Sequence, residues 1–104
     1  MSIDSSMDKV LERRQEVETQ LSRSAELSSK ELADLSRELS ELRPVSEQIE
    51  LVQSLEGELQ EAITMVTEAV GDQEMQAMAE AEVALLKDRI PGEKERLQLL
   101  LLPK

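Results

Sequence analysis

The chain has 104 residues, enough for one small domain, and carries 12 Lys and Arg against 23 Asp and Glu. The net charge of −11 argues against nucleic-acid binding, because phosphate neutralisation needs clustered cations. The sequence contains no aromatic residue, Cys or His, which excludes disulfides and the usual zinc ligand sets and favours elongated helices over a thick globular core.

No segment of the sequence is typical of membrane insertion or export. No apolar run approaches the ~20 residues that a helix needs to cross a bilayer. The first residues lack the basic and apolar regions of a signal peptide. We therefore expect a cytoplasmic protein without membrane contact.

The first predicted helix covers residues 4–22. Apolar residues recur along it at helical spacings of three, four and seven, and the stripe consists of Ile3, Met7, Val10, Val17 and Leu21. Arg14 occupies the position that this stripe skips, where its aliphatic stem can cover apolar neighbours while its charge stays in water. The serines between residues 22 and 29 compete for backbone hydrogen bonds and predict a turn.

The second predicted helix covers residues 29–70. Ser28 and Glu31 match a capping box at its start. Its apolar stripe consists of Leu32, Leu35, Leu39, Leu42, Ile49, Val52, Leu59, Ile63, Val66 and Val70. Pro44 removes one helical hydrogen bond and crowds the preceding turn, which costs about 3 kcal/mol in a continuous helix. Because the stripe keeps its phase across Pro44, we predict one long helix kinked there, with two separate helices as the alternative.

The third predicted helix covers residues 73–101. Gly71 is expected to end the second helix and Asp72 to cap the third. The apolar stripe of the third helix consists of Met75, Met78, Ala79, Leu86, Ile90, Leu97, Leu100 and Leu101. Pro91 and Gly92 predict a break or bend near its end.

The link between the second and third helices is so short that they must form an antiparallel hairpin, along which the first helix is expected to pack. The predicted fold class is all-α, a three-helix antiparallel coiled coil or bundle. We expect residues 1–104 to form a single helical domain.

The residue types that catalysis needs are missing or scattered. Serines are plentiful, but no histidine exists to activate one. Closely spaced carboxylates are typical of solvated helix faces rather than acid–base pairs; they are Glu47, Glu50, Glu80 and Glu82. The pair Arg13-Arg14, beside Glu12 and Glu16, is likewise interpreted as a solvated face with pairs one turn apart. No phosphate-binding or EF-hand loop occurs, so we predict no catalytic, cofactor-binding or metal-binding residue and no enzymatic activity.

Two apolar groups remain to be placed. Met65, Met75 and Met78 gather around the predicted hairpin turn, where we expect them to fill an irregular core beneath the tip. An adaptable methionine-rich binding surface is the alternative.

The last turn of the third helix is apolar nearly all round, and its leucines, Leu99, Leu100, Leu101 and Leu102, are expected to be buried against a further segment or partner. A polar helical chain that finishes in leucines and Pro103 is expected to be a fragment of a larger protein.

Two motifs carry a family resemblance. The run Gly-Asp-Gln-Glu-Met-Gln-Ala-Met-Ala-Glu at 71–80 and Leu-Leu-Leu-Pro-Lys at 100–104 resemble the N-terminal domain of the bacterial peptide chain release factor 1 family. Ser-Arg-Glu-Leu at 36–39 is similar to the family's Ser-Arg-Glu-aromatic segment, from which it departs at Leu39. Gln73 stands where the family often has proline.

The resemblance implies a cytoplasmic factor that acts on the ribosome at UAA or UAG and triggers peptidyl-tRNA hydrolysis. The family's Pro-x-Thr codon motif and Gly-Gly-Gln catalytic motif lie downstream of this region and do not occur here, so no residue is assigned to codon recognition or hydrolysis. The implied partners are the ribosomal stalk base with its L11-type protein, and downstream domains of the same protein at residues 99–102. A free-standing acidic coiled-coil adaptor or oligomerisation protein is the alternative.

Overall fold

The computed structural model describes residues 3–103, which form three α-helices and no strand. Helix α1 comprises Ile3–Leu21, α2 comprises Ser29–Glu68 and α3 comprises Gln73–Leu101. A single 3-10 turn, η1 at Ser24–Glu26, lies in the predicted turn between α1 and α2. The all-α prediction is therefore confirmed for the described part of the chain. The side chain of Ile3 and residue Lys104, which also entered the sequence predictions, lie outside the described residues.

Local hydrogen bonds fix where α2 and α3 begin. The Ser28 Oγ accepts a hydrogen bond from the Glu31 amide at 3.1 Å, and the Glu31 carboxylate accepts one from the Ser28 amide at 3.3 Å, which confirms the capping box. The Asp72 carboxylate accepts a hydrogen bond from the Met75 amide at 3.1 Å, which confirms the predicted cap of α3. Gly71 has a φ of 99°, which a residue with a Cβ rarely adopts, and so turns the chain between the two helices.

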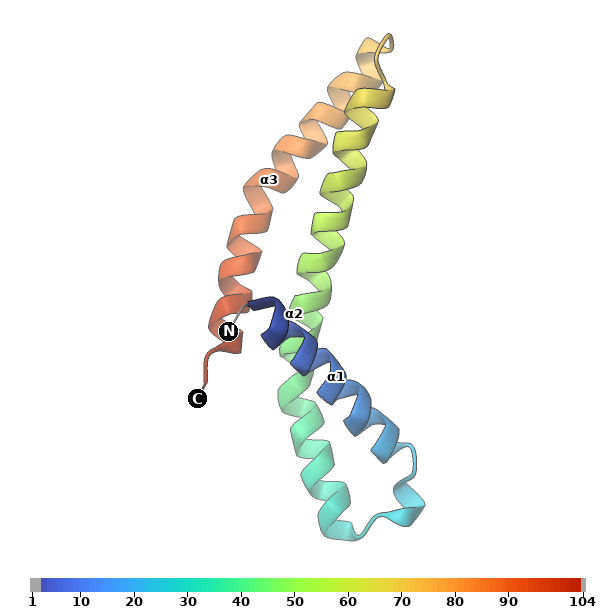
Figure 1. Ribbon diagram of the computed structural model, residues 1–104, viewed down its shortest axis with the longest axis vertical. Coiled ribbons are helices and arrows are strands. Elements are labelled where there is room, and N and C mark those ends of the chain that lie inside the picture. Colours follow the sequence, from blue (N-terminus) through green and yellow to red (C-terminus); the bar gives the residue numbers. More distant parts are fainter. Residues whose placement is uncertain (1–2, 104) are drawn as a thin grey trace.

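Both internal prolines lie within continuous helices. Helix α2 passes through Pro44 as one helix, as predicted, and its cyan and yellow-green parts run in different directions (Figure 1). Helix α3 likewise continues through Pro91, so a break there is wrong, although the helix is curved (Figure 1). The side chains of Ile90 and Glu93, on either side of Pro91, are buried.

The three helices meet at one place only, which we call the junction. Its buried centre is Ile49, Val52 and Leu97, and against it pack Met7, Val10, Leu11, Val45 and Leu101. Beyond the junction the molecule continues as two arms of two helices each, within overall dimensions of 64 × 28 × 19 Å (Figure 1). The upper arm, residues 55–86, is the α2–α3 hairpin, and the lower arm, residues 13–46, joins α1 to the beginning of α2.

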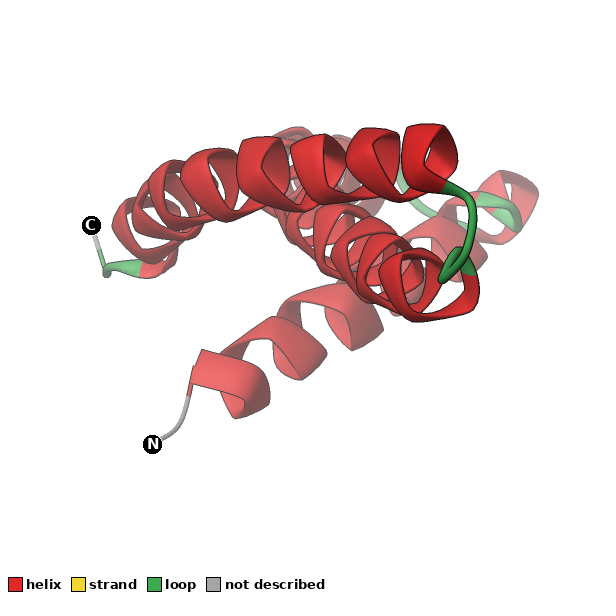
Figure 2. Ribbon diagram, turned by 90° about the horizontal axis from the view of Figure 1, so that it is seen from above, coloured by secondary structure: helices red, strands yellow, loops and turns green. Residues whose placement is uncertain are grey.

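Contrary to the expectation, helix α1 does not pack along the whole α2–α3 hairpin. It lies against the N-terminal half of α2 and reaches α3 at the junction. Seen from the tip of the upper arm, α1 lies to one side of the α2–α3 hairpin and farther from the viewer (Figure 2). The reason is length: 19 residues span about 28 Å, whereas the 40 residues of α2 span about 60 Å.

The register of the upper arm differs from the predicted stripe. Its buried positions on α2 and at the C-cap of that helix are Leu55, Ala62 and Ala69, which are seven residues apart. The larger Ile63 and Val70 are exposed. Together with the half-buried Leu59 and Val66, the buried positions give the alternating three- and four-residue spacing of a coiled-coil seam. On α3 the buried apolar positions Ala79, Leu86, Ile90 and Leu97 agree with the prediction.

Candidate protein interaction surfaces

The candidate sites among the described residues are open surfaces between and along the helices. No group of three or more metal-ligating side chains occurs among them. None of their helices is long and apolar enough to cross a membrane. The carboxylates considered for acid–base chemistry are all exposed; they are Glu47, Glu50, Glu80 and Glu82.

Charge is divided unequally between the two arms. The lower arm contains seven acidic and six basic residues, whereas the upper arm contains eight acidic residues and no Lys or Arg. The upper arm therefore carries eight of the eleven net negative charges. A surface of this kind repels phosphates and attracts basic partners.

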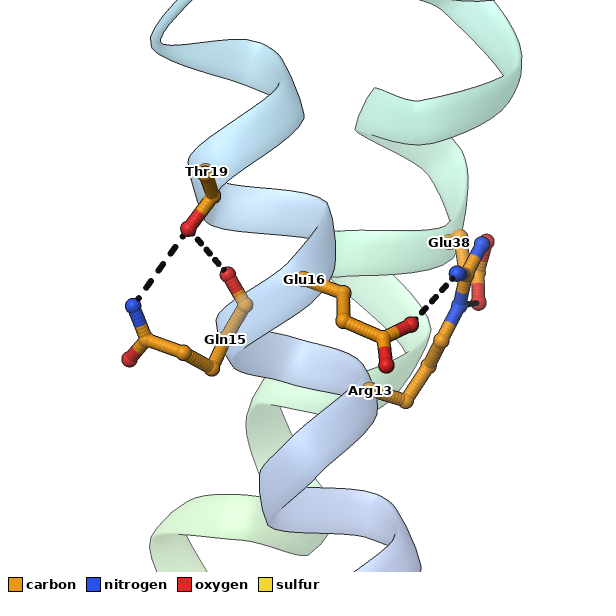
Figure 3. A network of polar contacts seen from close by, with 5 residues as sticks. All are labelled: Arg13, Gln15, Glu16, Thr19 and Glu38. Atoms are coloured by element: carbon orange, nitrogen blue, oxygen red, sulfur yellow. Dashed lines mark hydrogen bonds and ion pairs between the residues drawn. The ribbon is translucent and has the colours of Figure 1, made fainter.

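In the lower arm, Arg13 joins α1 to α2 (Figure 3). Its Nη2 donates to the Glu38 Oε1 at 2.7 Å, its Nε donates to the other Glu38 oxygen, and its Nη1 lies 3.1 Å from the Glu16 carboxylate. The two-pronged hydrogen bond from Arg13 lowers the pKa of Glu38 and, in return, raises the pKa of Arg13. On the neighbouring face of α1, the Thr19 hydroxyl donates to the Gln15 carbonyl at 2.9 Å (Figure 3).

Arg14 makes a second link between the same helices. Its Nη1 donates to the Oγ of Ser46, a fully buried serine that in turn donates to the Arg43 carbonyl at 3.0 Å. The Arg14 Nε lies 3.3 Å from a Glu18 oxygen without hydrogen-bond alignment. The interpretation of Arg13-Arg14 is confirmed for the pairs one turn apart, with Glu16 and Glu18, but it missed the links to α2, because spacing along α1 does not reveal acceptors on another helix. The placement of Arg14 over the apolar stripe is confirmed.

A buried carboxylate at the α2–α3 seam was missed from the sequence. Glu93 is 9% exposed and occupies the seam position between Ile90 and Leu97. The Gln48 side chain donates to its carboxylate at 3.1 Å and to its backbone carbonyl at 3.0 Å, while Arg96 lies 3.2 Å from the same carboxylate. The available signal was its spacing, three residues after Ile90 and four before Leu97, which is that of a seam position. Because its oxygens are paired within the fold, Glu93 stabilises the register of the hairpin.

The tip methionines are not core residues. Met65, Met75 and Met78 are 41%, 49% and 69% exposed, so the prediction that they fill the core is wrong. Alanines occupy the seam beneath them instead. The three methionines line a groove of about 450 Å³, the methionine groove, together with Glu58, Glu61, Ala62, Ala79 and Glu82.

The end of α3 presents a second apolar surface. Leu99, Leu100 and Leu102 are exposed and form what we call the leucine surface. Leu101 differs from them because it packs against the junction. Of the four leucines singled out from the sequence, one is therefore part of the core and three face outward.

The family model and the curated relatives that match this chain cover most of it and point to the same family. The family model of the PCRF domain matches residues 10–104. The peptide chain release factor 1 of Ruegeria pomeroyi is 40% identical over 98 residues, which cover 94% of this chain and 26% of that protein. The peptide chain release factor 1 of Granulibacter bethesdensis is 34% identical over 104 residues, which cover 100% of this chain and 28% of that protein. The chain thus spans about a quarter of the length of these curated relatives. No solved structure matches it.

Proposed function

Because the chain belongs to the family of proteins that contain a PCRF domain, we propose that it acts in translation termination, as the N-terminal helical domain of a peptide chain release factor. The observation that carries the proposal is the family match over residues 10–104, together with relatives named peptide chain release factor 1. It favours this role over a free-standing coiled-coil adaptor.

Within such a factor this domain binds the ribosome and takes no part in the chemistry. The complete protein directs peptidyl-tRNA hydrolysis at UAA and UAG in the cytoplasm, and codon reading and hydrolysis belong to the parts of the factor that this chain does not cover. The described residues support this division, since their polar clusters at Arg13, Arg14 and Glu93 are paired within the fold.

The partner surface proposed for the domain is protein rather than RNA. Eight carboxylates without a basic residue make the upper arm unsuited to ribosomal RNA but complementary to a basic protein. We assign this contact to the stalk base and its L11-type protein. The leucine surface is assigned to a contact with downstream domains of the same protein, because clustered exposed leucines are typical of a surface that is covered in the assembled molecule.

A reconstituted release assay with the protein encoded by the complete gene tests the role. Ribosomes stalled at UAA and UAG are expected to release their peptide, and ribosomes stalled at UGA are the matched control. The 104-residue chain alone is expected to release no peptide at any codon. Release at UGA equal to that at UAA, or release by the chain alone, would contradict the proposal.

The ribosome contact is tested by stopped-flow association of the complete factor. Glu68→Lys with Glu80→Lys reverses charge on the exposed upper arm and is expected to slow association several-fold at low salt, because steering by opposite charge is lost. Glu12→Lys with Glu41→Lys makes the same change outside the upper arm and is expected to alter the rate much less. An unchanged association rate for the upper-arm variant would contradict the assignment of the ribosome contact to the upper arm.

A further inference from the structure

We propose that the methionine groove is a docking site for a cationic amphipathic helix of a partner protein. The inference concerns the chemistry of this surface and does not depend on the translational role. Two independent observations carry it: the apolar lining of the groove, and a charge distribution around it that contains carboxylates and no cation.

The lining of the groove suits apolar side chains. Met65 comes from α2 and Met75 and Met78 come from α3, and all three are partly exposed although alanines fill the seam between the helices. Methionine is unbranched and polarisable, so three of them adapt to the shape of an inserted aliphatic or aromatic side chain. The volume of about 450 Å³ lies within the range of about 300–1,000 Å³ found for binding pockets.

The rim of the groove selects a basic partner. Glu58 and Glu61 on α2 and Glu82 on α3 line it together with the methionines, and residues 55–86 contain no Lys or Arg that could neutralise them. A second copy of this chain is disfavoured as occupant, because two chains of net charge −11 repel each other. A nucleic acid is disfavoured by the same sign of charge.

The junction shows that this hairpin accepts a third helix. There α1 packs Met7, Val10 and Leu11, at positions i, i+3 and i+4, against the buried cluster that α2 and α3 share. In the upper arm α2 and α3 run on without α1 (Figure 1). The methionine groove is lined by residues of both helices. An incoming helix with apolar residues at the same spacing would present them to the methionines, and its Lys and Arg would face the glutamates.

The test uses the 104-residue chain with methyl-labelled methionine and a synthetic 14-residue peptide that has Leu at positions i, i+3, i+4, i+7 and i+8 and Lys elsewhere. We expect saturable shifts of the Met65, Met75 and Met78 methyl resonances in the NMR spectrum. Met7 packs at the junction and serves as an internal control, because its methyl resonance is expected not to shift. A peptide of identical composition, scrambled so that it has no apolar face, is expected to cause no saturable shift.

Matched variants separate the apolar and electrostatic contributions. Met75→Gln with Met78→Gln is expected to weaken peptide binding at least tenfold, whereas Leu85→Gln, an equally exposed change on α3 outside the groove, leaves it unchanged. Replacing the three rim glutamates by Gln is expected to weaken binding and reduce its salt dependence. The same replacement at Glu47 and Glu95, which lie outside the groove, is expected to have a much smaller effect.

Three outcomes would overturn the proposal. The first is equal binding of the scrambled peptide, which would reduce the effect to net charge. The second is a shift of Met7 as large as that of the groove methionines. The third is a concentration-dependent dimer in sedimentation that Met75→Gln with Met78→Gln dissociates, which would assign the groove to a second copy. Circular dichroism of each variant verifies that it is helical. The methyl shifts that the peptide causes in the unmodified chain test the proposal even if a variant does not fold.

Discussion

The two arms share the helix α2, but they differ in the balance and the pairing of their charged residues. In the lower arm, acidic and basic residues are nearly balanced, and Arg13 and Arg14 of α1 are paired with groups on α2. In the upper arm, residues 55–86 contain eight carboxylates and no Lys or Arg, and Glu56 is paired with Lys94 from outside the arm at 3.3 Å. Alanines fill the seam of this arm and methionines lie outside it. Charge that is paired inside the fold contributes to its stability, while charge left unpaired is available to a partner.

The comparison also shows why the junction matters to both arms. Each arm has a narrow seam of its own: the upper arm buries Leu55, Ala62 and Leu86, and the lower arm buries Val17. Ile49 and Leu97, among the most deeply buried large side chains, lie where all three helices meet. We therefore expect the arms to depend on the junction more than on each other.

The largest effect is expected from Leu97→Ala. Removing this fully buried side chain leaves a cavity that three helices share, and we expect a loss of about 3 kcal/mol in the free energy of unfolding. Urea unfolding followed by circular dichroism measures it. The control is Leu85→Ala on the same helix, an exposed position where the loss is expected to stay below about 0.5 kcal/mol. Equal losses for the two variants would mean that the junction does not anchor the fold.

A smaller loss is expected from Glu93→Ala. The change removes the carboxylate that accepts from Gln48 in the seam, and the expected loss of stability is about 2 kcal/mol. Glu93→Gln keeps an oxygen that can accept the same hydrogen bond and is expected to lose less than half as much. If both variants were as stable as the parent chain in thermal unfolding, Glu93 would have no role in the register of the hairpin.

The independence of the arms is tested by a matched pair of glycine substitutions. Ala81→Gly in the upper arm and Ala33→Gly in the lower arm, both at exposed helical positions, each remove helix propensity worth about 1 kcal/mol. We expect the first to accelerate amide hydrogen exchange in residues 55–86 and the second to accelerate it in residues 13–46. Acceleration of both arms by either variant would show that they open as one unit.

The smallest effect is expected from Glu38→Gln, and it depends on pH. Since Arg13 lowers the pKa of Glu38 below its ordinary value of 4.5, the pair stabilises the folded state above that pH. The stabilisation is lost as the pH falls through the lowered pKa. Glu38→Gln is therefore expected to be slightly less stable than the parent chain at neutral pH, with the difference vanishing in acid. In an Arg13→Gln background the pH-dependent difference should be absent, and its persistence in urea unfolding would contradict the assigned cause.

Features that depend on neighbours within one turn could be predicted from the sequence. The capping box of Ser28 and Glu31 and the cap at Asp72 involve residues three positions apart, so their hydrogen bonds follow from the local pattern. The continuity of α2 through Pro44 followed from the phase of the apolar stripe. The family resemblance carried by residues 71–80 and 100–104 is likewise confirmed by the PCRF domain match.

Features that depend on the facing helix could not be predicted. The predicted stripe in the upper arm included Ile63, yet the seam follows the heptad position and buries Ala62 instead. The same choice of seam turned Met75 and Met78 outward and created the methionine groove. The periodicity of apolar residues along one helix cannot reveal a candidate site that is made by residues from two helices.

The sequence by itself determined that residues 3–103 form three α-helices, where α2 and α3 are capped, and to which family the chain belongs. Only the tertiary structure decided which face of each helix is buried, that Arg13 and Arg14 are paired with α2, and that the upper arm leaves its methionines and carboxylates exposed. The physical reason is the range of the interactions. Hydrogen bonds within one turn are encoded by neighbouring residues, whereas the burial of a helix face is set by the partner helix that covers it.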